Sequence, residues 1–173
     1  GRVPVRVGVS IGDTLAAWHG VIGVMMALYH RKVNGGPGQV IDVALHEAVF
    51  NIMESLIPEY SAFGAVREAA GSALPGIAPS NAYPCQDGWV LVAGNGDSIF
   101  KRLMAAIGRQ DLADAPDLAD NAGRVARVVE IDGAIGAWTQ VRSVQTVMDE
   151  LGAARVPAGK VYTAKDIAED PHY

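Results

Sequence analysis

The chain has 173 residues, half of them hydrophobic, and a formal net charge of −5. A chain of this length buries about 70% of the surface that its unfolded form exposes, which is enough for one core and a small second one. Its 14 lysine and arginine residues are scattered along the sequence. We therefore expect no nucleic-acid partner and no anionic membrane surface, because both require a coherent basic face.

The single cysteine, Cys85, has no partner for an internal disulfide, which is typical of a reducing compartment, so we expect a cytoplasmic protein. No signal peptide is evident in the sequence. The apolar run at residues 21–29 is shorter than the roughly 20 residues that cross a bilayer, so we also expect no membrane span.

Residues 1–60 are predicted to form the tail of a larger domain, in the order strand, helix, strand, helix. Alternating apolar residues predict a strand at 5–9, and apolar residues three and four positions apart predict a helix at 13–32. A glycine-rich turn then leads to a short strand at 39–43. An apolar helix at 45–57 follows, and we expect Pro58 to end it.

Residues 61–80 contain several glycines and prolines and are predicted to be a linker or loop. Residues 81–173 are predicted to form a small α+β domain with a short antiparallel sheet. The expected strands span 81–84, 89–93 and 156–162. The expected helices span 97–107, 121–138, 143–151 and 163–168, with Ser143 as an N-cap.

Two local motifs imitate well-known sites and fail on inspection. The run Gly94-Asn95-Gly96-Asp97-Ser98-Ile99 resembles a dinucleotide fingerprint, but Ile99 stands where the third glycine is needed. We interpret it as a tight turn before a helix that Asp97 or Ser98 caps. The pair His46-Glu47 begins like a zinc-protease helix, but Phe50 occupies the second histidine position, so we expect no metal site.

Ser10 lies in Gly8-Val9-Ser10-Ile11-Gly12, between the predicted strand and the predicted helix, which is the context of a nucleophile elbow. Asp166 and His172 follow in the order that a serine hydrolase requires, although they are only six residues apart. The simpler interpretation is that the two glycines permit a tight turn. A serine hydrolase that uses Ser10 is therefore a remote alternative.

Asp13 precedes the long apolar helix, and aspartate is among the best N-cap residues. A cap alone explains its position. A helix N-terminus also favours an ionised carboxylate, and a fixed anion is what a carboxylate nucleophile requires. The residues alone leave both roles open.

The stretch from Ser10 to Glu54 resembles the central region of the class III CoA-transferases. This family includes formyl-CoA and carnitine-CoA transferases, the L-carnitine dehydratase/bile acid-inducible protein F group and the α-methylacyl-CoA racemases. The first matching elements are Gly12-Asp13 and the turn and strand at 35–43. The later ones lie at residues 76–79, 83–84, 87–88, 93–95, 121–125, 156–159 and 170–172.

The resemblance implies an α/β protein of the interlocked CoA-transferase III fold, of which this chain is the end of the large domain plus the small α+β domain. It implies an interlocked homodimer, with acyl-CoA and carboxylic acids as substrates and no metal. It assigns Asp13 as the nucleophile, which forms an aspartyl–acyl anhydride and then an aspartyl-CoA thioester. The motifs are closest to those of transferases that use dicarboxylic acids such as succinate.

The resemblance also points to substrate-binding residues in the second half of the chain. A glycine-rich loop covers the intermediate in some relatives, and residues 71–76 lie in the comparable region without its consecutive glycines. Gly71, Gly76, Asn95 and Gly96 are therefore the candidate substrate-binding residues. An interdomain connector and a structural turn explain the same residues equally well.

Two further alternatives remain open at the level of the sequence. In a racemase of this family, the same aspartate is one of two acid/base groups, and its histidine partner lies upstream of this chain. The chain by itself is alternatively a packing or oligomerisation module, because the part that binds most of the CoA is absent. The isolated fragment is expected to be inactive.

Overall fold

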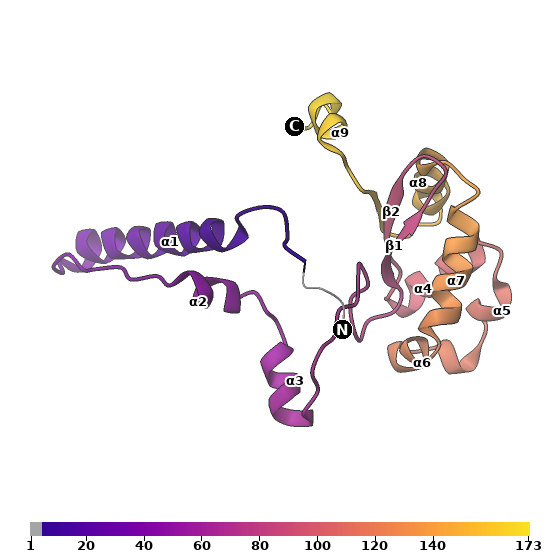
Figure 1. Ribbon diagram of the computed structural model, residues 1–173, viewed down its shortest axis with the longest axis horizontal. Coiled ribbons are helices and arrows are strands. Elements are labelled where there is room, and N and C mark those ends of the chain that lie inside the picture. The colour runs from indigo at the N-terminus through magenta and orange to yellow at the C-terminus, as the bar shows by residue number, and fades with distance from the viewer. Residues whose placement is uncertain (1–4) are drawn as a thin grey trace. The chain divides into compact units, whose positions relative to one another are not determined.

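The computed structural model describes residues 5–173 (Figure 1). The chain divides into two compact units, an N-terminal unit, Gly1–Ala69, and a C-terminal unit, Ala70–Tyr173. The mixed helix and strand composition agrees with the predicted fold class, and the C-terminal unit contains the predicted short antiparallel sheet.

The N-terminal unit consists of α1 (Ile11–Asn34), α2 (Leu45–Phe50) and α3 (Leu56–Phe63). Helix α1 ends at Gly35, whose φ of 65° is a left-handed conformation that glycine adopts without strain. It packs against the segment that leads into α2. A β-carbon added at Gly23 would lie 2.7 Å from the Ile41 side chain, so this glycine permits close approach.

Four predictions for the N-terminal unit are wrong. Residues 5–9 and 39–43 are not strands, because no neighbouring strand pairs with them within residues 5–173. The helix predicted at 45–57 is interrupted after Phe50 and resumes as α3. Pro58 lies in the first turn of α3, where the missing N–H breaks no helical hydrogen bond, so this proline starts a helix and does not end one.

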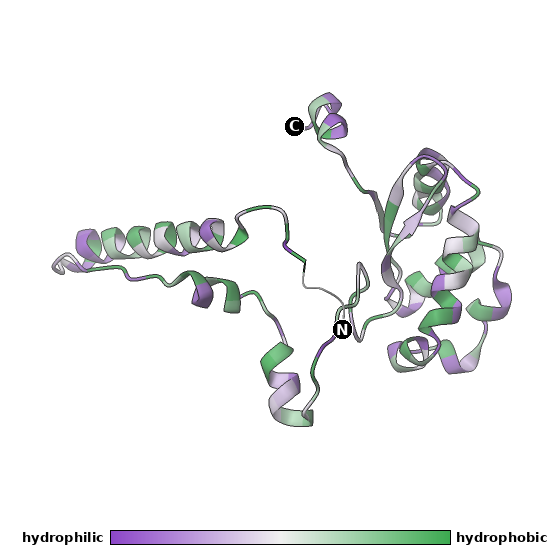
Figure 2. Cartoon of the chain, viewed as in Figure 1, coloured by the Kyte–Doolittle hydropathy of each residue, from purple (hydrophilic) through white to green (hydrophobic). Residues whose placement is uncertain are grey.

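Helix α1 is also longer than predicted. Its 24 residues make it long and apolar enough to cross a membrane, although the core helix of a soluble protein or a signal sequence meets the same criterion. Figure 2 shows hydrophobic residues along its whole length, and most of them are exposed. The length of the apolar run at 21–29 therefore does not by itself exclude a membrane span.

The C-terminal unit is built on an antiparallel sheet in the order β1-β2-β3. The strands are β1 (Ser80–Pro84), β2 (Trp89–Ala93) and β3 (Ala158–Lys160). Tyr83 pairs with Val90, and Val92 pairs with Ala158. The helices are α4 (Asp97–Ala106), α5 (Gln110–Ala113), α6 (Asn121–Ala126), α7 (Val128–Thr139), α8 (Val144–Ala153) and α9 (Ala164–Glu169), with a short 3-10 turn at Pro116–Leu118.

One hydrophobic core joins the sheet to helices α4, α7 and α8. Along β2, Val90 and Val92 are buried while Trp89 and Leu91 are exposed, as the period of two in a strand requires. The helices contribute fully buried side chains at helical spacing. These are Phe100, Leu103 and Met104 from α4, Ile131 and Ile135 from α7, and Val147 and Leu151 from α8.

The predicted strands at 81–84 and 89–93 and the helix capped by Ser143 are confirmed, since the Ser143 hydroxyl accepts a hydrogen bond from the Thr146 N–H. The long helix predicted at 121–138 is wrong: it breaks at Arg127 into α6 and α7. Helix α6 lies very close to the 3-10 turn. Glycine permits this approach, because a β-carbon at Gly123 would lie only 1.6 Å from the Asp117 carbonyl oxygen.

Two smaller expectations are also corrected. The last strand is only three residues long, since β2 pairs with three residues of β3. The N-cap of α4 is Gly96, and it makes no side-chain hydrogen bond, so neither Asp97 nor Ser98 caps this helix.

Candidate functional site

Asp13 is the third residue of α1, and its side chain is exposed. Ser10 occupies the N-cap position, and its carbonyl accepts hydrogen bonds from the Thr14 N–H and hydroxyl. The interpretation of Asp13 as an N-cap is therefore wrong. Within residues 5–173, the Asp13 carboxylate accepts no hydrogen bond and forms no ion pair, so it is open to solvent at the positive end of the helix dipole.

Ser10 does not have the setting of a nucleophile elbow. No strand precedes it within the described residues, and its hydroxyl makes no hydrogen bond there. The carboxylate proposed for a triad, Asp166, accepts hydrogen bonds from Lys160 and Thr163, which hold its pKa well below the ordinary 3.8. His172 contacts Asp170, which was not the predicted acid. Asp166 and His172 are therefore not paired with each other as a catalytic triad requires.

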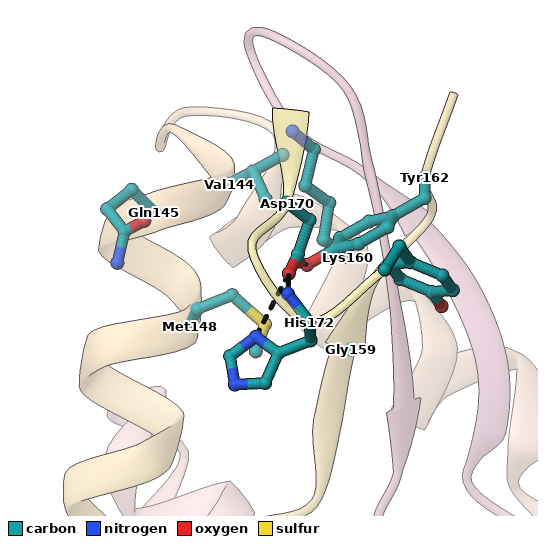
Figure 3. A pocket seen from close by; sticks show the side chains of 9 residues that line it. Val144, Gln145, Met148, Gly159, Lys160, Tyr162, Asp170 and His172 are labelled. Atoms are coloured by element: carbon teal, nitrogen blue, oxygen red, sulfur yellow. Dashed lines mark hydrogen bonds and ion pairs between the residues drawn. The ribbon is translucent and has the colours of Figure 1, made fainter. Parts of the chain in front are cut away.

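A cavity of about 680 Å³ lies beside this histidine, between α8, β3 and the segment that follows α9. Figure 3 shows the imidazole of His172 directed at the Asp170 carboxylate, at 2.9 Å. Tyr162 donates its hydroxyl proton to the same carboxylate, at 2.7 Å. The backbone N–H of His172, the Tyr162 hydroxyl and the imidazole together lower the pKa of Asp170. His172, the histidine of the hydrolase alternative, lines this cavity, whereas the candidate substrate-binding residues do not.

Helix α6 brings three of the four candidate substrate-binding residues together. The Asn121 side chain donates to the Gly76 carbonyl at 2.8 Å and accepts from the Ala78 N–H at 3.1 Å. One turn later, Arg124 donates to the Asn95 carbonyl at 2.8 Å. The loop at Gly76 and the turn at Asn95 and Gly96 are therefore held by one short helix.

Gly71 is not held by α6. It has a φ of 69° and open space around it, and the next residue, Ser72, donates its hydroxyl proton to the Asn81 side chain at 2.6 Å. Asn81 in turn donates to Asp132, which also accepts from the Tyr83 hydroxyl. Burial and the Asp132 carboxylate raise the pKa of Tyr83 far above its ordinary value of 10. This chain of side chains ties the start of the loop to α7.

Sequence reasoning missed Asn121 and Arg124 as site residues. A signal was present, because an asparagine at the start of a predicted helix with an arginine three residues later places both side chains on one face. That signal does not say which loops the two side chains reach. No group of three or more metal-ligating side chains occurs in the part of the chain that the structure describes.

Comparison with known proteins decides the family. The family model described as CoA-transferase family III matches residues 1–173. The chain belongs to CoA-transferase family III. The resemblance predicted from the motifs is thereby confirmed.

Among its relatives, succinyl-CoA–D-citramalate CoA-transferase of Chloroflexus aurantiacus is 45% identical over 99% of this chain and 43% of the relative. Succinyl-CoA:mesaconate CoA-transferase of Haloarcula hispanica is 31% identical over 98% of this chain and 42% of the relative. This family III chain therefore spans less than half of the length of the curated relatives that it matches.

Solved structures agree with the fold. A CaiB/BaiF family protein from Brucella suis matches with a TM-score of 0.76 and 30% identity, covering 99% of this chain and 45% of that one. A Mycobacterium tuberculosis protein matches with a TM-score of 0.81 at 19% identity, over 98% of this chain and 44% of that one, and this match bears on the fold alone.

Proposed function

We propose that the full-length family III protein that contains this chain transfers coenzyme A between carboxylic acids, with Asp13 as the nucleophile. The observation that carries the proposal is the family match over residues 1–173. Relatives named for succinyl-CoA with citramalate, malate or mesaconate support a short dicarboxylic acid as donor and acceptor. The exposed position of Asp13, without a hydrogen-bond partner within residues 5–173, supports its role because a nucleophile must reach the substrate.

In the proposed reaction, a carboxylate oxygen of Asp13 attacks the thioester carbonyl carbon of the acyl-CoA donor. The C–S bond breaks, giving a mixed anhydride and the CoA thiolate. The thiolate then attacks the aspartyl carbonyl carbon, releases the donor acid as its carboxylate and leaves an aspartyl-CoA thioester. The acceptor carboxylate repeats these two steps in reverse, which regenerates Asp13 and balances both charge and atoms.

Water is the main competitor in this scheme, because an anhydride or a thioester on the enzyme hydrolyses when solvent reaches it. The proposed site therefore needs more than the nucleophile. We propose that Gly71, Gly76, Asn95 and Gly96 contribute to substrate binding.

Trapping experiments on the full-length protein test the nucleophile. With succinyl-CoA and hydroxylamine, the wild-type protein is expected to carry a hydroxamate on Asp13, located by peptide mass spectrometry. Asp13→Asn keeps the shape and removes the nucleophile, so CoA transfer is expected to fall by at least about 1,000-fold. Ser10→Ala, in the preceding turn, is the matched control and is expected to retain transfer.

Three results would contradict the proposal and separate the alternatives. Loss of activity in Ser10→Ala with activity retained in Asp13→Asn indicates a hydrolase. Exchange of the α-proton of an acyl-CoA with deuterium in the absence of transfer indicates a racemase. No trapping and no turnover in the intact protein indicates a packing role.

We also propose that the full-length protein is an interlocked homodimer in which α1 is a core helix. A helix that is hydrophobic on all sides is stable in water only when other elements cover it, and the exposed residues of α1 include Trp18, Val24 and Met26, which lie on different sides. Light scattering of the full-length protein in buffer without detergent checks this proposal. A monomer, or a protein that remains with the membrane fraction, would contradict it.

A further inference from the structure

Arg124 is the one charged side chain of the described chain that is fully buried, with 0% exposure. Its guanidinium donates to the carbonyls of Ala78 and Leu118, both at 3.1 Å, and to the Asn95 carbonyl at 2.8 Å. It also donates to the Asp97 carboxylate at 2.8 Å and lies 5.2 Å from the centroid of the Phe100 ring. Every polar atom of this side chain is thus placed by the fold.

Burial of the Arg124 charge costs folding free energy, so a contribution to stability does not explain why an arginine occupies this position. The neutral carbonyls accept hydrogen bonds without cancelling the buried charge, and the side chain of Asp97, which carries the opposite charge, is 69% exposed. A hydrophobic side chain of similar volume would fill the space without that cost. An arginine does what an apolar residue cannot, because its N–H donors fix several acceptors in a rigid planar geometry.

Apart from the Leu118 carbonyl in the 3-10 turn, the acceptors belong to two segments that each include an exposed residue. Gly76 and Asn95 are exposed, whereas Ala78 and Gly94 beneath them are buried. The Gly94 N–H donates to the Pro79 carbonyl at 3.0 Å, which ties the two segments to each other. A β-carbon at Gly94 would lie 2.5 Å from the Leu103 side chain, so this glycine permits close approach to α4.

Asn121 completes the support from the same helix. Its amide binds the segment 76–78 at both ends, through the Gly76 carbonyl and the Ala78 N–H. Segments 76–78 and 95–97 are therefore both held by hydrogen bonds from two side chains of α6. Loops that bind ligands are commonly positioned in this way by a rigid scaffold.

We infer, on the basis of the proposed function, that Arg124 and Asn121 are positioning residues that hold segments 76–78 and 95–97 in the arrangement that binds the carboxylic acid substrates. Neither side chain touches substrate. A displaced surface binds the acceptor acid poorly, and an empty acceptor site leaves the enzyme-bound intermediate to water. Positioning variants therefore raise the acceptor KM and the number of hydrolysis events per transfer.

The test uses steady-state kinetics of the full-length protein with succinyl-CoA and a short dicarboxylic acid such as citramalate. Asn121→Asp keeps an acceptor for the Ala78 N–H but loses the donor to the Gly76 carbonyl, and an acid in the first turn of a helix is favourable for folding. We expect about a tenfold rise in both the acceptor KM and the hydrolysis-to-transfer ratio. Arg124→Lys removes the planar guanidinium and is expected to raise the acceptor KM and the hydrolysis-to-transfer ratio by more than about tenfold.

Matched controls separate positioning from general damage. Gln140→Glu makes the same chemical change on an exposed amide that forms no side-chain hydrogen bond within residues 5–173. Arg127→Lys removes an arginine fork that binds Asp117 and Glu130 at the surface. Both controls are expected to leave the hydrolysis-to-transfer ratio unchanged. This ratio does not depend on how much of the protein is folded, because unfolded molecules catalyse neither hydrolysis nor transfer.

The outcomes distinguish the inference from the function on which it rests. A lower rate with an unchanged acceptor KM and ratio would show that Arg124 and Asn121 are merely structural and would overturn the inference. Unchanged kinetics in both variants would overturn it as well. If the wild-type protein transfers no CoA, or if Asp13→Asn transfers normally, the proposed function itself fails and the inference fails with it.

Discussion

The two units of the chain differ in how they bury their hydrophobic residues. In the N-terminal unit, the buried hydrophobic residues among those described are Leu15 and Ala48, while most of the apolar side chains of α1 are exposed. The C-terminal unit places seventeen residues in one buried cluster. Burial of apolar surface is the main favourable term in folding, so the C-terminal unit has its own source of stability and the N-terminal unit does not.

The two units therefore obtain their stability from different sources. A helix such as α1 is stable when other elements cover it, and the relatives extend well beyond the part that this chain matches. The N-terminal unit is therefore expected to depend on the remainder of the full-length protein.

Separate expression of the two units gives the largest expected contrast. Ala70–Tyr173 is expected to unfold in one cooperative thermal transition, whereas Gly1–Ala69 is expected to show none, because it has almost no core to lose. Circular dichroism melting curves and amide hydrogen exchange measure both. A cooperative transition in the N-terminal unit would remove the basis of the comparison.

Truncation of one core side chain is expected to have the next largest effect. Phe100 is 1% exposed, so Phe100→Ala is expected to lower the free energy of unfolding of the C-terminal unit by about 3–5 kcal/mol. Ile22 is 57% exposed in this chain, and Ile22→Ala is expected to change stability by less than about 0.5 kcal/mol. Urea denaturation measures both changes in the free energy of unfolding. Ile22→Ala should become clearly more costly in the full-length protein if α1 is covered there.

Acid is expected to weaken the C-terminal unit moderately. The Arg127 side chain lowers the pKa of Asp117, and the Lys160 side chain lowers that of Asp166, both below the ordinary 3.8. A carboxyl whose folded pKa is lowered stabilises the fold above pH 3.8, and this contribution is lost as the pH falls through the folded pKa. The C-terminal unit should therefore melt at progressively lower temperature below about pH 4, and Arg127→Gln should reduce that dependence.

The N-terminal unit offers one carboxyl for comparison. Hydrogen bonds from Arg67 and Ser55 lower the pKa of Glu59 from 4.5 to about 2. Carbon NMR of labelled glutamate in the full-length protein should show Glu59 titrating near pH 2, and Arg67→Gln should move its midpoint toward 4.5. An unchanged midpoint in that variant would show that the ion pair does not form.

The smallest expected effect concerns backbone strain. Arg155 follows α8 with a φ of 55°, a left-handed conformation that glycine adopts more easily. Arg155→Gly is expected to stabilise the C-terminal unit by up to about 1 kcal/mol. Glu54, with a φ of 53° in the N-terminal unit, is the matched position, and Glu54→Gly should leave the melting of the chain unchanged. Destabilisation by Arg155→Gly would indicate that the arginine side chain has a separate role.

Local patterns predicted the parts of the fold that depend on near neighbours in the sequence. Ser143 caps a helix, and β2 alternates because every second side chain faces the core. The strand predicted at 39–43 was wrong, because a strand needs a partner strand and none within residues 5–173 pairs with it. The strand predicted from alternating apolar residues at 5–9 was wrong for the same reason.

The sequence by itself determined the family and the identity of the candidate nucleophile, since the motifs around Asp13 keep their order along the chain. Tertiary structure decided how the candidate substrate segments are supported. Arg124 reaches the carbonyls of Asn95 and Ala78, which lie 29 and 46 residues away in the sequence. No local periodicity reports such contacts, because they exist only once the helix, the loop and the turn have folded against one another.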